Sequence, residues 1–221
     1  MGPAANRGYN FGVTSIHSFD ETQLSAELAK LQSKGRMAFA AAVACRPLGA
    51  CERFAGQLGL ASEGRPREIA VQLWSALLGD ASERTTWVMA LEEVMNFLPQ
   101  APPAAPDAGS FAHGLVDDAL SSLVYAIRCL LSPDADEAAW AARCAYESIG
   151  RAALRALRLQ ADTPEAEAQV LAHPWVQREL ERQRRDLSAL LADRSPAAMS
   201  VLQQRSSAEE LLTADEALTL E

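Results

Sequence analysis

The residues best suited to chemistry in this chain lie in one apolar segment, Ser110 to Leu131, which reads SFAHGLVDDALSSLVYAIRCLL. His113 and Asp117 are four residues apart, so on a helix they would share one face at a spacing that suits a metal ion or an acid–base pair. Asp117 and Asp118 are adjacent, and adjacent residues on a helix diverge by about 100°. The two acids therefore cannot form a carboxylate dyad, and any site here would use His113 with Asp117.

A purely structural interpretation of the same segment stays open beside the chemical one. Its apolar residues form one stripe that includes His113, with Asp117 at the edge and Asp118 pointing almost the other way, toward Tyr125 and Cys129. Acidic residues in the first turns of a helix interact favourably with its dipole, and a histidine there can cap or pack. We therefore predict no bound metal or cofactor, and keep these residues as candidate binding positions.

Two other segments carry arginines at helical spacing. The first set consists of Arg151, Arg155 and Arg158, and the second of Arg178, Arg182 and Arg185. Such sets could hold phosphate groups or an acidic partner. Glu147 and Glu181 each lie four residues before an arginine, so ion pairs within the helix are an equally natural prediction. The acidic C-terminal residues could also fold back on these arginines.

Bulk properties exclude several functions. The formal net charge of −9 over 221 residues argues against general binding to nucleic acid or to an anionic membrane. The longest apolar run, Met37 to Cys45, is far shorter than the roughly 20 residues of a membrane-spanning helix. The first residues lack the pattern of a signal peptide. These observations predict a soluble, cytoplasmic protein.

Known catalytic and metal-binding motifs are missing from the sequence. The four cysteines form no CxxC pair, which indicates reduced, buried thiols and not a zinc site. No Glu-x-x-His pair is present, so a ferritin-like di-metal centre is excluded. Phosphate-binding glycine loops, GxSxG and HExxH are absent as well.

The composition favours helices throughout, because alanine, leucine, glutamate and arginine dominate and no alternating stretch predicts a strand. We predict a compact all-α bundle of about seven or eight helices without a sheet. The expected helices cover residues 18–45, 50–58, 66–78, 80–97, 110–131, 133–159, a short stretch from 163, and 174–191. The predicted organisation is a loose segment 1–17, a single helical domain 18–195 with a proline-rich crossing at 99–110, and an acidic tail 196–221.

Several stretches together resemble the YjaG-like family, a bacterial family of unknown function. They are FAAAVACRPLGACERFAGQLGL, REIAVQLWSALLG, ALEEVMNFLP, DDALSSLVYAIRCLL and HPWVQRELERQRRDLSALL. The resemblance covers Leu31 to Ala192 and departs from the family at the turn RPLG. It implies an all-helical cytoplasmic protein with no established activity, in which Asp118 matches a polar position of the family.

These observations favour a non-enzymatic interaction or regulatory protein whose partner is another protein or a second copy of the chain, as in a homodimer. One alternative is a small-molecule or metal-dependent enzyme that uses His113 and Asp117. A second alternative is nucleotide or nucleic-acid binding through the two arginine sets, Arg151, Arg155 and Arg158 and Arg178, Arg182 and Arg185.

Overall fold

The computed structural model describes residues 16–60, 64–79, 83–99, 111–159 and 163–220, and all regular elements in these segments are helices. The eleven helices are α1 (Glu21–Leu28), α2 (Ser33–Cys45), α3 (Leu48–Gln57), α4 (Arg65–Leu78), α5 (Arg84–Phe97), α6 (Phe111–Leu131), α7 (Ala135–Leu157), α8 (Pro164–Ala172), α9 (Pro174–Ala192), α10 (Pro196–Ala208) and α11 (Ala214–Leu218). The all-α class is confirmed. The expected number of seven or eight helices is too low.

The extra helices have two origins. The single helix expected over residues 18–45 is broken after Leu28, so that α1 packs along α7 while α2 turns into the core, and Leu31 is buried at the break. Residues 196–220, beyond the expected bundle, form α10 and α11. Met199, Leu202 and Leu212 from this stretch are buried in the core. The proline-rich crossing lies almost entirely outside the described residues.

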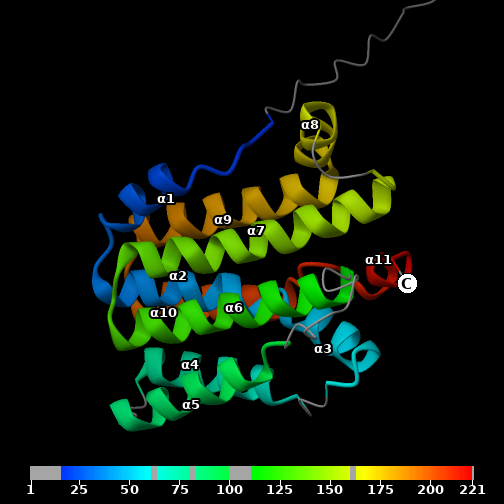
Figure 1. Cartoon of the computed structure of the whole chain (residues 1–221). Coiled ribbons are helices and arrows are strands. Elements are labelled where there is room, and N and C mark those ends of the chain that lie inside the picture. Colours follow the sequence, from blue (N-terminus) through cyan, green and yellow to red (C-terminus); the bar gives the residue numbers. More distant parts are fainter. Residues whose placement is uncertain (1–15, 61–63, 80–82, 100–110, 160–162, 221) are drawn as a thin grey trace, which may run out of the picture.

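Helix α2 occupies the centre of the molecule (Figure 1). Seven consecutive residues, from Ala38 to Ala44, are buried on every side of this helix. A helix that is apolar all round is stable only inside a core, and its alanines allow close approach by its neighbours. Helices α4, α6, α7, α9 and α10 all pack against α2. The run that was too short to cross a membrane is thus the core helix of the bundle.

The longest contact joins α6 and α7, which run beside each other over most of their length (Figure 1). Alanines on α7, among them Ala138, Ala142 and Ala145, have no exposed surface, and their small side chains allow neighbouring helices to approach closely. None of the helices in the described segments combines the length and apolar character needed to cross a bilayer.

Candidate functional site

Asp118 lies in the interface between α6 and α7, with only 6% of its surface exposed. Its Oδ2 accepts a hydrogen bond from Arg151 Nε at 3.2 Å. The face of α6 opposite the apolar stripe is therefore not a free surface, because α7 covers it: Ser122 donates to the Ala141 carbonyl, and Tyr125 packs on Trp140. Polar and small residues make up this second buried face, so apolar periodicity alone did not reveal it.

Gly114 creates the path by which Arg151 reaches Asp118. A Cβ atom at Gly114 would lie 2.5 Å from Arg151 Nε, so the guanidinium stem crosses α6 where a side chain is missing. Burial raises the pKa of Asp118 to about 6, although the Arg151 guanidinium lowers it. Arg151 does not use Glu147, which pairs with Arg143 instead.

His113 and Asp117 are both partly buried in the first turns of α6. Within the described segments, no three His, Cys, Asp or Glu side chains gather closely enough to hold a metal ion. The role of His113 with Asp117 stays a prediction. All four cysteines are free, and burial raises the pKa of Cys51, Cys129 and Cys144 to about 12, so these thiols are protonated at neutral pH.

Arg155 and Arg158 occupy the C-terminal end of α7. The Arg155 guanidinium lies 5.4 Å from the centre of the Phe111 ring, on α6. Arg158 follows the helix with a positive φ of 55°. Across the part of the chain that the structure describes, neither guanidinium contacts a carboxylate. Together with Leu154, Ala156, Leu159, Thr219 and Leu220 they line a half-open hollow of about 610 Å³.

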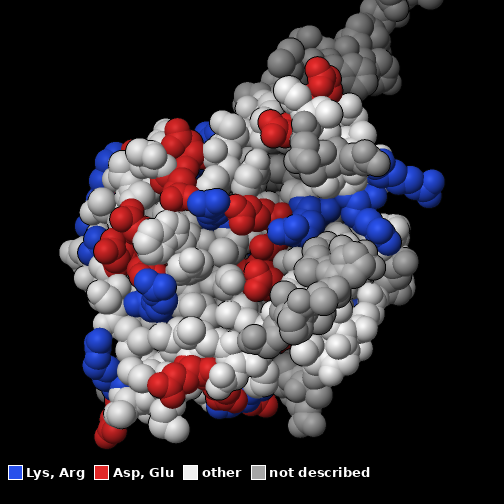
Figure 2. Space-filling model, in the orientation of Figure 1, with Lys and Arg blue, Asp and Glu red and all other residues white. Residues whose placement is uncertain are grey.

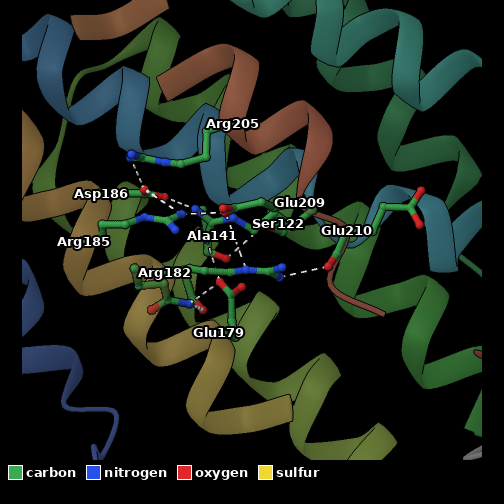
Figure 3. Close-up of polar contacts among 12 residues, drawn as sticks. Ser122, Ala141, Glu179, Arg182, Arg185, Asp186, Arg205, Glu209 and Glu210 are labelled. Atoms are coloured by element: carbon green, nitrogen blue, oxygen red, sulfur yellow. Dashed lines mark hydrogen bonds and ion pairs between the residues drawn. The ribbon is translucent and has the colours of Figure 1, made fainter. Parts of the chain in front are cut away.

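The arginines of α9 are bound by the C-terminal segment. Arg178 donates to both carboxylate oxygens of Glu216 at 2.7 Å, and Arg185 donates to Glu209. Arg182 donates to the Glu210 carbonyl at 2.9 Å (Figure 3). The hypothesis that acidic C-terminal residues fold back on this helix is confirmed.

Below these contacts lies a buried charge cluster that sequence reasoning missed. Arg46, only 1% exposed at the junction of α2 and α3, donates to Glu179 Oε1 at 2.8 Å and to Asp186 Oδ2. Arg205 of α10 also donates to Asp186, and Gln183 donates to Glu179 (Figure 3). The available signal was on α9, where Glu179, Gln183 and Asp186 occupy helical positions shared with Val176 and Leu190. Polar residues at core positions require buried partners.

The outer face of α5 carries exposed apolar side chains. Helix α5 lies at the lower edge of the bundle and packs mainly on α6 (Figure 1). It buries Trp87, Ala90 and Val94. On its other side the exposed fractions are 39% for Val88, 67% for Met89 and 51% for Met95. These three residues, with the intervening Glu92, define the α5 face.

Residues 23–211 match the model of a protein family described as "Protein of unknown function (DUF416)". The chain belongs to this family. A similar solved structure is the crystal structure of a DUF416 family protein from Shewanella baltica OS155, with a TM-score of 0.70 and 14% sequence identity. The alignment covers 86% of this chain and 94% of that one, so the two share a fold. No curated protein matches the sequence.

Proposed function

We propose that this DUF416 protein is a non-enzymatic interaction protein that associates with a second copy of itself through the α5 face. The observation that carries the proposal is the exposure of Val88, Met89 and Met95 on one helix. Methionine-rich surfaces adapt well to a packing partner because the thioether side chain is flexible and polarisable. The narrower YjaG-like assignment remains a prediction, and the free thiols favour a cytoplasmic location.

The charge distribution favours a second copy as the occupant of this face. Two chains of net charge −9 repel each other, so they approach most easily through a surface with few charges. The α5 face meets this condition, since Glu92 is its one acid and the neighbouring Glu93 is neutralised by Arg65 at 2.7 Å. Added salt should strengthen such a dimer by screening the repulsion, whereas it would weaken binding to a basic partner.

Sedimentation velocity on the purified chain tests the proposal. We expect a dimer at micromolar concentrations that becomes tighter as salt increases. The double substitution Met89→Asp and Met95→Asp should give a monomer, because two carboxylates would be buried in the contact. Val201→Asp, at a position 57% exposed on α10, is the matched control and should remain dimeric. A monomeric wild-type chain, or a double variant that still dimerises, would contradict the proposal.

A further inference from the structure

The hollow at the end of α7 is a concave, positively charged surface. Its volume of about 610 Å³ falls within the range of small-molecule sites. Its lining residues include Arg155, Arg158, Thr219 and Leu220, and within the described segments none of the lining residues is acidic. Figure 2 shows lysine and arginine side chains gathered on the right of the molecule, where α7 ends in Figure 1. Elsewhere in this view the basic side chains alternate with acidic ones.

The backbone at Arg158 gives an independent reason to assign a role to its side chain. The Arg158 N–H donates to the Arg155 carbonyl, and the Leu159 N–H donates to the Leu154 carbonyl at 3.2 Å. This pair of bonds ends α7 in a Schellman motif, whose left-handed position is usually glycine. Arg158 is the one residue other than glycine with positive φ in the described segments. A strained residue of this kind is retained most readily where its side chain is used.

Arg155 is oriented by its neighbour on α6. The Phe111 ring covers one face of its guanidinium at 5.4 Å, which leaves the N–H groups at the edge of the plane available. Arg151, one turn earlier, is already bound to Asp118 and is not available. Thr219 is not a donor either, because its hydroxyl donates to the Glu216 carbonyl at 2.6 Å. Two guanidinium groups therefore supply the polar recognition in the hollow.

We propose that this hollow binds a phosphate monoester carried by a small apolar body. A phosphate monoester is close to a dianion at neutral pH and presents three acceptor oxygens. These oxygens can accept hydrogen bonds from the paired N–H donors of two guanidinium groups. A carboxylate has one charge and two acceptor oxygens, so it neutralises two guanidinium groups less completely than a phosphate monoester does. Leu154, Leu159 and Leu220 provide apolar contact for the rest of the ligand. The site is separate from the α5 face and does not depend on dimerisation.

Titration of the wild-type chain with phenyl phosphate at low ionic strength tests the proposal, with binding followed by calorimetry and phosphorus NMR line width. We expect a Kd of about 1 mM or tighter. Arg155→Gln and Arg158→Gly should each weaken binding at least about tenfold, as expected for a lost charge-assisted hydrogen bond. Benzoate should bind at least about tenfold more weakly than phenyl phosphate, because it lacks the second charge.

The Arg158→Gly variant separates function from folding. Glycine adopts a positive φ without the steric cost that a Cβ atom imposes, so the Tm should rise by about 2–4 °C. Binding of phenyl phosphate should weaken at the same time. Arg194→Gln, an exposed arginine between α9 and α10, is the control and should bind like wild type. The proposal is overturned if phenyl phosphate shows no saturable binding, if Arg158→Gly retains wild-type affinity, or if benzoate binds equally well. Equal affinity for inorganic phosphate would contradict the role of the leucines.

Discussion

Helices α7 and α9 carry three arginines at the same spacing, yet the two sets differ in the groups that bind their guanidinium groups. On α9, Arg178 is held by Glu216 of α11, and Arg182 and Arg185 are held by residues of the segment that connects α10 to α11. Of the three arginines in the α7 set, only Arg151 has a carboxylate partner in the described structure, and the other two line an open hollow. The difference lies in what packs opposite each helix.

This contrast shows why arginine spacing alone cannot separate a structural face from a binding face. A guanidinium that meets a carboxylate of its own chain is neutralised and fixed in position. A guanidinium that meets an aromatic ring, as Arg155 meets Phe111, keeps its charge and most of its donors. Substitutions of these arginines and of their carboxylate partners test this division between α9 and α7.

The largest effect is expected at the base of the α9 cluster. Asp186 is fully buried and accepts hydrogen bonds from Arg46 and Arg205. Asp186→Ala leaves the buried Arg46 with one carboxylate fewer, and should lower the free energy of unfolding by about 3–5 kcal/mol. Urea denaturation measures this loss. Glu181→Ala, on the exposed side of the same helix, is the control, and its effect should stay below about 1 kcal/mol. Equal losses in the two variants would contradict a special role for the buried cluster.

A smaller, pH-dependent effect is expected at Asp118, the carboxylate that Arg151 contacts. Burial raises the pKa of Asp118 from 3.8 to about 6. Its contribution to stability is therefore complete below pH 3.8 and is lost as the pH rises through about 6. Relative to Asp118→Asn, the wild-type chain should lose about 2 kcal/mol between pH 4 and pH 7. Chemical denaturation across this pH range measures the difference.

Arg151→Gln sharpens the same prediction. Because the guanidinium lowers the pKa of Asp118, its removal should raise the upper limit of the pH range over which stability falls to above pH 6. A wild-type stability that stops falling near pH 4 would show that Asp118 is not buried as described.

The smallest change in stability is expected for single substitutions in the two arginine sets. Arg178→Gln breaks a two-bond pair with Glu216 and should cost about 1 kcal/mol, less at high salt. Arg155→Gln breaks no ion pair and should change stability by less than about 0.5 kcal/mol. The hydrogen bond from Arg178 lowers the pKa of Glu216, so the contribution of this pair is present above pH 4.5 and is lost as the pH falls below it. Thermal melts in low and high salt measure both variants.

Much of the fold follows from local patterns in the sequence. Apolar periodicity placed α6 and α9 well, and prolines at the first helical position marked the starts of α8 and α9. The break between α1 and α2 was missed because no proline or glycine marks residues 29–32. The break has a tertiary cause, since α1 packs on α7 while α2 enters the core.

The site residues were less accessible to sequence reasoning. Asp118 was placed on the correct side of α6, but a single helix pattern does not reveal that α7 covers it. In the sequence, Arg46 was notable only because the turn RPLG, which contains it, departs from the pattern of the YjaG-like family. Its partners lie 133 and 140 residues further along the chain, and pairing over such distances depends on the packing of whole helices. Local spacing carries no information about such a contact.

The position of Arg46 also has a consequence for the order of events during synthesis. Its carboxylate partner Asp186 is translated 140 residues later, which takes roughly 7–28 seconds at the usual rates of 5–20 residues per second. The Leu211 N–H that donates to the Arg46 carbonyl follows later still. Until α9 and α10 have been made, a nascent core that enclosed α2 would bury an unpaired cation. We therefore expect the hydrophobic centre of the bundle to close late, after almost the whole chain has been synthesised.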